Sequence, residues 1–218
     1  RPLGRALIEL AEASTVPVSV HLDHAESTDL CREAVELGFT SIMYDGSKLP
    51  DAQNRETTAE ITAFAHEHGV SVEAELGEVG GKNGVHDPSA RTNPEDAAQF
   101  VADTGVDLLA VAVGSSHAMA TREAVLDNQL IAAIHDLVPV PLVLHGSSGV
   151  PDEGMVAAIQ AGMTKINVST HLNVVFTQGV RQILDENPKI VDPRKYVGPA
   201  THSVQEEVER LMRLYAQA

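Results

Sequence analysis

The sequence is poor in cysteine and in aromatic residues. Cys31 is the only cysteine among 218 residues. An intrachain disulfide is therefore impossible, and we expect the protein to work in the reducing cytoplasm. Tryptophan is absent and aromatic residues make up 3% of the chain, whereas hydrophobic residues reach 43%. This composition is typical of a globular protein with an aliphatic core, and the length suits one domain.

Positive charge is also scarce. The chain has 15 Lys and Arg against 31 Asp and Glu, which gives a formal net charge of −16. Such a chain repels nucleic acids and anionic membrane surfaces, so we expect neither as a partner. No apolar run approaches the roughly 18–20 residues that span a bilayer. Phosphorylated substrates would be repelled as well, so a phosphate site has to be built locally from backbone N–H groups and a few cations.

Short apolar runs alternate with longer amphipathic segments along the chain. Six of these runs are predicted strands, at residues 18–23, 41–45, 71–77, 108–114, 141–146 and 164–170. Predicted helices lie between them. Asn93 and Pro94 open one that ends at Gly105, and Pro151 opens another that ends at Gly162. Segments 1–14 and 203–218 are predicted to be helices at the two ends of the chain. Apolar strands joined by helices indicate a parallel sheet that helices cover.

Polar residues distinguish a closed barrel from an open sheet. They follow the carboxyl ends of successive predicted strands, at Asp23 and His24, Asp45, Glu75, His117, His145, and Asn167 to Thr170. An open sheet would concentrate such residues at one switch point, whereas a barrel collects them on one rim. We therefore predict an α/β fold, a (β/α)8 TIM barrel, that forms a single domain over residues 1–218. Because only six strands are predicted, a complete barrel would need two more strands and a helix, about 50–60 residues, in front of Arg1.

Three of the ten histidines follow predicted strands, namely His24, His117 and His145. One such histidine is more often an ordinary core or surface residue, but three on one rim indicate a metal site. Three neutral imidazoles with an open fourth position are typical of catalytic zinc. His21 is expected to pack inside the fold or to orient a ligand. The histidines on predicted helices are expected to face solvent: His66, His68, His135, His171 and His202.

Carboxylates lie beside these histidines. Asp23 directly precedes His24, and the pattern leaves two roles open for it. It could orient an imidazole, or it could be a general base near a metal-bound substrate. Glu73 and Glu75 share one face of a strand, where one of them could approach the metal or form an ion pair inside the barrel.

Three loops are rich in small residues. The loops at residues 145–149 and 167–170 follow the last two predicted strands, which would be strands seven and eight of a complete barrel. These two loops commonly bind phosphate in barrels, through backbone N–H groups and hydroxyls. The segment Gly77–Gly84 is a long glycine-rich loop of the type that closes over a substrate.

The sequence closely resembles the class II, metal-dependent ketose-bisphosphate aldolases, among them the fructose- and tagatose-bisphosphate aldolases. The resemblance runs over essentially the whole chain, and the combination of HLDH with ELGEVGG is highly specific for the family. The matching motifs are VPVSVHLDHA at 16–25, GFTSIMYDGSKLP at 38–50, VSVEAELGEVGG at 70–81, PLVLHGSSGVP at 141–151, TKINVST at 164–170 and DPRKYVGPA at 192–200.

The resemblance implies a role for individual residues. Asp23 matches the catalytic acid/base of the family, and His24, His117 and His145 match its three zinc ligands. Glu75 matches a carboxylate that contacts an alternative metal position. The residues of the two phosphate loops match those that bind the dihydroxyacetone phosphate moiety, and in relatives the same loops hold a monovalent cation, Na⁺ or K⁺. These residues are Gly146, Ser148, Asn167, Ser169 and Thr170, with Ser147 in the same loop.

The implied reaction is the reversible cleavage of a ketose 1,6-bisphosphate to dihydroxyacetone phosphate and glyceraldehyde 3-phosphate. Zinc polarises the ketose carbonyl, Asp23 takes the proton of the C4 hydroxyl, and the C3–C4 bond breaks to a zinc-stabilised enediolate. The family also implies a homodimer or homotetramer. The alternatives are a class II aldolase for another phosphorylated ketose or keto-deoxy sugar acid, and a non-catalytic aldolase-like subunit.

Two departures from the family pattern bear on the substrate. Ala118 follows His117 where the family usually has glycine, so a Cβ is expected near the phosphate or cation site. The glycine-rich loop also lacks the usual acidic residues after its glycine pair. Glu78, His86 or Asp87 would then have to supply the proton that the enediolate needs.

Overall fold

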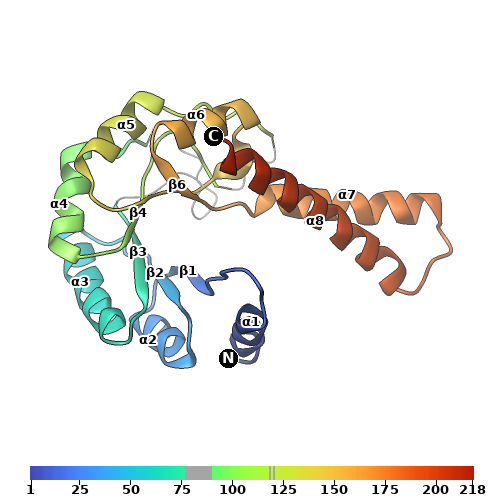
Figure 1. The fold of residues 1–218 in the computed structure, drawn as a ribbon, viewed down its shortest axis with the longest axis horizontal. Coiled ribbons are helices and arrows are strands. Elements are labelled where there is room, and N and C mark those ends of the chain that lie inside the picture. Colours follow the sequence, from blue (N-terminus) through green and yellow to red (C-terminus); the bar gives the residue numbers. More distant parts are fainter. Residues whose placement is uncertain (77–89, 118, 120) are drawn as a thin grey trace.

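The structure is a computed structural model that describes residues 1–76, 90–117, 119 and 121–218. Six strands form one parallel sheet in the order of the sequence, and the sheet curls so that helices cover its outside (Figure 1). The predicted parallel barrel architecture is therefore confirmed, as a curled six-stranded part of a barrel in which β1 and β6 are the edge strands. The strands are β1 (His21–Ala25), β2 (Ser41–Tyr44), β3 (Ser71–Glu75), β4 (Leu108–Ala110), β5 (Leu142–Leu144) and β6 (Met163–Ile166).

Helices alternate with the strands, as the sequence predicted. Their bounds are α1 (Pro2–Glu12), α2 (Thr28–Leu37), α3 (Asp51–Glu67), α4 (Pro94–Thr104), α5 (Asn128–Leu137) and α6 (Asp152–Gln160). Local chemistry sets several of these ends. The Asn93 side chain accepts a hydrogen bond from the backbone N–H of Asp96 at the start of α4, and Gly105 ends α4 in a left-handed conformation with φ of 67°.

The hydrophobic core lies on both faces of the sheet. Between the sheet and the outer helices, strand residues such as Ile42 and Leu142 pack with helix residues such as Phe100, and all three are fully buried. A smaller cluster lies inside the curl and contains Met43, Ala110 and Val143. Because side chains alternate along a strand, this inner face also carries the polar residues that lead to the rim.

Two boundaries near the carboxyl end differ from the sequence prediction. The run predicted as a strand up to Thr170 ends at Ile166, because the carbonyl of Asn167 accepts a hydrogen bond from the Ser147 hydroxyl and Thr170 already begins α7 (Thr170–Glu186). The final helix, α8 (Arg194–Ala216), begins nine residues before Ser203. It contains Pro199, a residue that usually disfavours a helix interior, and the sequence prediction started the helix beyond it.

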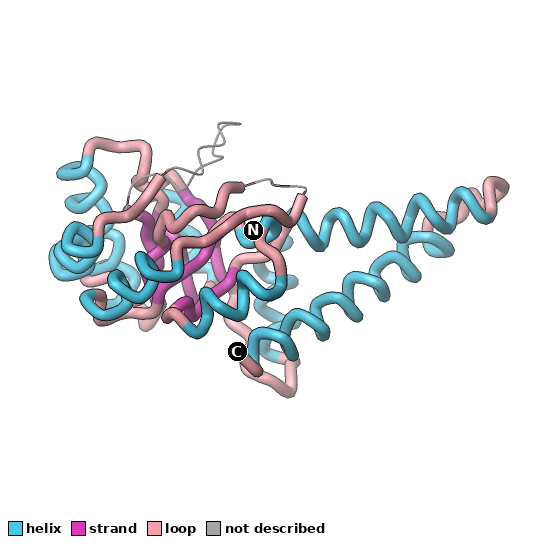
Figure 2. Tube along the Cα trace, turned by 90° about the horizontal axis from the view of Figure 1, so that it is seen from above, coloured by secondary structure: helices cyan, strands magenta, loops and turns pink. Residues whose placement is uncertain are grey.

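The last two helices form a hairpin. α7 and α8 pack against each other and project away from the sheet (Figures 1 and 2), while the carboxyl half of α8 returns to pack on α6. No residue of α7 is fully buried. Within the described part of the chain, no helix has both the length and the apolar character needed to cross a membrane.

We expect the interior of the sheet to dominate the stability of the fold. Leu142 is fully buried on β5, three residues before His145, whereas Leu10 on α1 is 69% exposed. The substitution Leu142→Ala should lower the free energy of unfolding by about 2–5 kcal/mol, because it leaves a cavity in the core. Urea denaturation followed by circular dichroism measures the effect. The matched substitution Leu10→Ala should change stability by less than about 0.5 kcal/mol, and equal effects of the two would contradict this account of the core.

Candidate metal centre and active site

The first residues of the site lie in an irregularity of β1. The pairing of β1 with β2 shifts register between Leu22 and Ala25, and Asp23 and His24 occupy the shift. Consecutive strand residues normally point to opposite faces, but such a bulge re-aims a side chain, and both Asp23 and His24 line one cavity at the rim. His24 has φ of 50°, a left-handed conformation that costs a residue other than glycine about 1–3 kcal/mol. Such strain is typical of functional positions.

Three histidines from distant parts of the chain meet at this rim. His24 belongs to β1, His117 follows β4, and His145 follows β5. Their ring centroids are separated by 5.2 Å for His24 and His117, 4.6 Å for His24 and His145, and 5.6 Å for His117 and His145. Each ring offers a nitrogen within 4.8 Å of the nitrogens of the other two. The structure therefore brings together the three histidines that the sequence singled out.

Two carboxylates fix the orientation of these rings. Nδ1 of His24 lies 2.7 Å from Oδ2 of Asp45, and Nε2 of His145 lies 2.8 Å from Oε1 of Glu73. An ionised carboxylate can only accept, so each imidazole donates its proton outward. The two remaining nitrogens, Nε2 of His24 and Nδ1 of His145, face each other at 2.9 Å. Two lone pairs at that distance repel unless a proton or a metal cation lies between them.

Asp45 is itself held in place by its own loop. Its Oδ1 accepts hydrogen bonds from the Ser47 hydroxyl at 2.6 Å and from the Ser47 backbone N–H at 3.2 Å. The Asp45 residue is 4% exposed. Sequence reasoning placed Asp45 on the rim but gave it no role. Its position could have indicated that it orients His24, because Asp45 follows β2 and β2 is the neighbour of β1, which carries His24.

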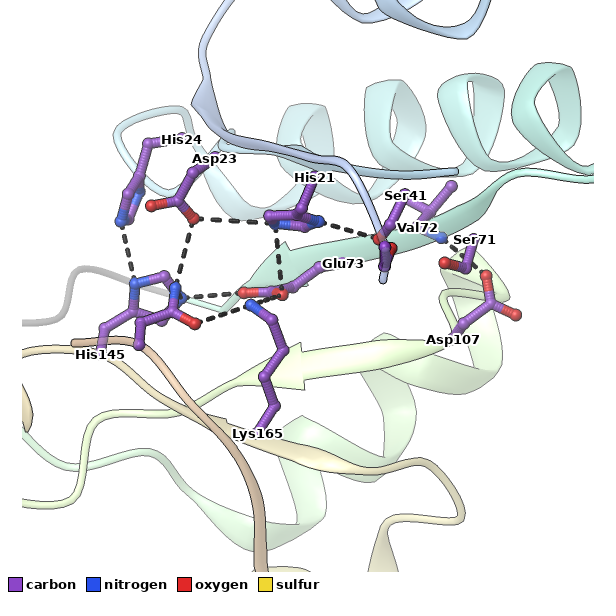
Figure 3. A network of polar contacts seen from close by, with 12 residues as sticks. His21, Asp23, His24, Ser41, Ser71, Val72, Glu73, Asp107, His145 and Lys165 are labelled. Atoms are coloured by element: carbon purple, nitrogen blue, oxygen red, sulfur yellow. Dashed lines mark hydrogen bonds and ion pairs between the residues drawn. The ribbon is translucent and has the colours of Figure 1, made fainter. Parts of the chain in front are cut away.

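Glu73 is the centre of a buried polar network inside the curled sheet (Figure 3). Its second oxygen accepts a hydrogen bond from Nζ of Lys165 at 2.7 Å, and Lys165 also donates to Oδ1 of Asn167 at 2.8 Å. Burial favours the protonated acid, but the hydrogen bond from His145 and the charge of Lys165 outweigh it and lower the pKa of Glu73. The sequence left two roles open for the glutamates of this strand, approach to the metal or an ion pair inside the barrel. Glu73 forms the ion pair, with Lys165.

Asp23 has a different environment. Its side chain is 50% exposed toward the cavity, and Nδ2 of Asn167 donates to its Oδ1 at 3.3 Å. Nε2 of His21 lies 3.7 Å from the same oxygen (Figure 3). Burial would raise the pKa of Asp23, but the approach of His21, with the positive charge that His24 and His145 can carry, lowers it to about 2. Asp45 and Glu73 are the carboxylates that orient the rings of His24 and His145.

His21 lies beneath Asp23, on the same face of β1. Its Nδ1 forms a hydrogen bond of 2.8 Å with Oγ of Ser41, and its Nε2 lies 3.6 Å from Oε2 of Glu73. The sequence predicted that His21 would pack inside or orient a ligand. In the structure its ring contacts the two carboxylates, Asp23 and Glu73, that flank the histidine cluster.

A cavity of about 330 Å³ opens above the histidines. The two loops predicted to bind phosphate contribute most of the remaining wall. Ser147 is the exception among the predicted phosphate residues, because it is buried and its hydroxyl donates to the carbonyl of Asn167 instead. The residues that line the cavity are Asp23, His24, His117, His145, Gly146, Ser148, Asn167, Ser169 and Thr170.

The turn after His145 requires glycine. Gly146 has φ of 66°, and a Cβ at this position would lie 2.6 Å from the backbone of Ser116. The carbonyl of His145 also accepts a hydrogen bond from the Ser115 hydroxyl at 2.6 Å. The loops that follow β4 and β5 are therefore in direct backbone contact, and this contact places His145 close to His117.

Glu75 lies fully buried on the same strand as Glu73. One of its oxygens lies within 4.8 Å of a nitrogen of His24 and an oxygen of Asp45, so these three residues form a second group that could hold a metal. Glu75 does not line the cavity above the histidines. The structure does not describe the glycine-rich loop Gly77–Gly84 that was predicted to close over the substrate. Also outside the described residues are the candidate proton donors Glu78, His86 and Asp87, and the departure Ala118.

One histidine prediction is wrong. His171 was expected to face solvent on a helix, but its side chain is only 20% exposed and its Nε2 lies 2.7 Å from Oε1 of Glu207 on α8. Its backbone N–H donates to Oγ of Ser148 at 3.1 Å. The prediction failed because the partner lies on α8, which packs beside α7, and no local pattern indicates that partner.

Comparisons with known proteins agree with the fold and with the motifs. The profile of the family described as fructose-bisphosphate aldolase class-II matches residues 1–218. A fructose-bisphosphate aldolase of Geobacillus stearothermophilus is 42% identical over 201 residues, which cover 91% of this chain and 70% of the relative.

Solved structures give the same result. The YdjI aldolase of Escherichia coli K12 superposes with a TM-score of 0.80 at 32% identity, over 98% of this chain and 74% of that one. A candidate fructose-1,6-bisphosphate aldolase of Coccidioides immitis superposes with a TM-score of 0.85 at 31% identity, over 99% and 77% of the two chains. The chain therefore belongs to the class-II fructose-bisphosphate aldolase family of enzymes.

Proposed function

We propose that the protein is a zinc-dependent aldolase that reversibly cleaves a ketose 1,6-bisphosphate to dihydroxyacetone phosphate and glyceraldehyde 3-phosphate. One observation carries the proposal. Nε2 of His24 and Nδ1 of His145 face each other at 2.9 Å, while the opposite nitrogen of each ring is hydrogen-bonded to a buried carboxylate. This arrangement prepares two neutral ligands for a cation, and His117 supplies the third.

The donor set suits zinc. Three imidazole nitrogens with an open fourth position are the ligands of many catalytic zinc sites, and the open side here faces the cavity. Zinc bound there would supply a Lewis acid for the ketose carbonyl.

A monovalent cation, Na⁺ or K⁺, is proposed for the adjoining loops, whose carbonyl and hydroxyl oxygens suit such an ion. Glu75 is proposed as a ligand of an alternative metal position, because it lies beside His24 and Asp45.

Asp23 is proposed to move the proton. Its carboxylate faces the cavity, and its pKa of about 2 keeps it in the accepting form at neutral pH. It takes the proton of the C4 hydroxyl as the C4–O bond becomes a carbonyl and the C3–C4 bond breaks. The electron pair of that bond stays with the three-carbon ketone fragment. In the direction of addition, Asp23 returns the proton to the new C4 oxygen.

The loops after β5 and β6 are proposed to bind the phosphate of the dihydroxyacetone half. Gly146 and Ser148 come from the first loop, and Asn167, Ser169 and Thr170 come from the second. Thr170 begins α7, so the amino end of a 17-residue helix adjoins the cavity. Helix amino ends bind phosphate through free N–H groups and the helix dipole, which offsets the net charge of −16 locally.

The substrate epimer and the assembly stay predictions. The same site would serve a fructose- or a tagatose-type bisphosphate, because the two differ only at C4. A coupled assay with both epimers decides between them. The homodimer or homotetramer and the cytoplasmic location remain predictions, which light scattering and cell fractionation test.

Removal of the Asp23 carboxylate tests the proton-transfer role. The substitution Asp23→Asn keeps the shape of the side chain but cannot accept the proton, so the kcat for cleavage should fall by about 10²–10⁴-fold. Bound zinc should stay within error of the unaltered protein, since Asp23 is not one of the proposed ligands. Asp136→Asn, at an exposed position of α5, is the control and should leave kcat unchanged. If Asp23→Asn kept more than a tenth of the activity, the assignment would be wrong.

Metal binding tests the centre itself. After purification with zinc, the protein should hold about one equivalent of tightly bound zinc. The substitution Glu73→Gln removes the charge that holds His145, so it should weaken zinc affinity by about 10–100-fold, measured by competition with a chromophoric chelator. Glu67→Gln on the surface of α3 should leave the affinity unchanged. Zinc binding that is equally tight in both variants would contradict the orienting role of Glu73.

A further inference from the structure

A row of charged side chains connects α8 with the loops of the site. The members alternate in sign along the row, and they come from four separate segments of the chain. The row has no part in the proposed cleavage chemistry, and α8 contributes no residue to the cavity wall. We call it the α8 charge row, and its members are Arg122, Asp152, Arg210, Glu207 and His171.

The first half of the row joins the loops after β4 and β5. Arg122 donates to the carbonyl of Val150 from two nitrogens, at 3.0 and 2.8 Å, and to Oδ1 of Asp152 at 2.6 Å. Asp152 in turn accepts from Nη1 of Arg210 at 2.6 Å. Val150 directly follows the loop that carries Ser148, and Asp152 begins α6 two residues later. α8 is therefore connected to the end of that loop through charged hydrogen bonds.

The second half of the row reaches the loop after β6. Glu207 accepts two hydrogen bonds of 2.8 Å from Arg210, one to each carboxylate oxygen. One of these oxygens also accepts from Nε2 of His171 at 2.7 Å. The backbone N–H of His171 then donates to Oγ of Ser148 at 3.1 Å. His171 directly follows Thr170, so the row ends where the two proposed phosphate loops touch each other.

The Glu207–His171 end of the row differs from ordinary surface ion pairs, because both side chains are largely shielded from solvent. Glu209 and Arg213 on the same helix form a local pair whose side chains are 58% and 71% exposed, and such pairs contribute little to stability. The Glu207 side chain is 17% exposed. Arg210 also donates to both oxygens of Glu207, and such a two-point contact fixes the relative orientation of the two side chains. The hydrogen bond from Arg210, together with the one from His171, lowers the pKa of Glu207 to about 2. Burial alone would raise this pKa, but its effect is smaller than that of Arg210.

We propose that Glu207 is a positioning residue that acts through His171 to hold the phosphate-binding loops of the site, so that α8 sets the affinity for the substrate phosphate without touching it. The inference rests on the proposed function of the cavity. A phosphate is recognised by several N–H and hydroxyl donors that must converge on one point, and a small displacement of a loop separates them. At the amino end of α7, the side chain of His171 contacts Glu207 on α8, and its backbone N–H donates to Ser148 in the loop that lines the cavity.

The test compares two glutamates on one helix. The substitution Glu207→Ala should raise the KM for the ketose bisphosphate by about tenfold and leave kcat within about twofold, because only binding of the phosphate is disturbed. The Kd of inorganic phosphate, measured by titration calorimetry on the zinc-loaded protein, should rise in parallel. Glu209→Ala should change neither quantity. Glu207→Gln keeps the size of the side chain and should give a smaller change in the same direction.

The role of His171 is tested by combining variants. In a chain that already carries His171→Ala, adding Glu207→Ala should raise KM by less than about twofold further, because the two residues act in one path. Unchanged KM and phosphate Kd in Glu207→Ala, or a loss of kcat and zinc with KM unchanged, would overturn the inference. Absence of cleavage by the unaltered protein would contradict the proposed function instead, and the phosphate titration would still decide the role of Glu207.

Discussion

The hydrogen bond between Nε2 of His145 and the buried carboxylate of Glu73 is the interaction on which the site depends. It fixes the tautomer of His145, so that Nδ1 faces His24. Glu73 can remain a carboxylate in the interior because His145 donates a hydrogen bond to it and Lys165 supplies the opposite charge at 2.7 Å. Lys165 also holds Asn167, which donates to Asp23. One buried acid therefore links the metal centre, the proposed base and the phosphate loop.

Three features of the fold position the residues of the site, namely the strand ends, the bulge in β1 and the turn at Gly146. Parallel strands end at one edge of the curled sheet, so residues far apart in the sequence meet there. The bulge in β1 turns Asp23 and His24 toward the same cavity, at the cost of a left-handed backbone at His24. Gly146 allows the loop after β5 to approach the backbone of Ser116. Outside the rim, α8 holds two of the loops through a row of charges.

Much of this arrangement could be predicted from the sequence. Strand and helix alternation gave the architecture, and strand ends identified His24, His117 and His145, because period and position are local properties. Contacts between distant residues could not be predicted in the same way. The pairing of Asp45 with His24 depends on the register of two strands, and the pairing of His171 with Glu207 depends on how α7 and α8 pack. The helix start at Arg194 was missed because Pro199 lies inside α8.

The central claim is that the three histidines hold a zinc ion through ring nitrogens that the carboxylates select. An anomalous difference map from crystals of the zinc-loaded protein, recorded at the zinc absorption edge, tests it most directly. We predict one peak about 2.0–2.1 Å from Nε2 of His24 and from Nδ1 of His145, with His117 as the third ligand. A peak that instead lay between the carboxylates of Asp45 and Glu75, or the absence of any peak beside His145, would contradict it.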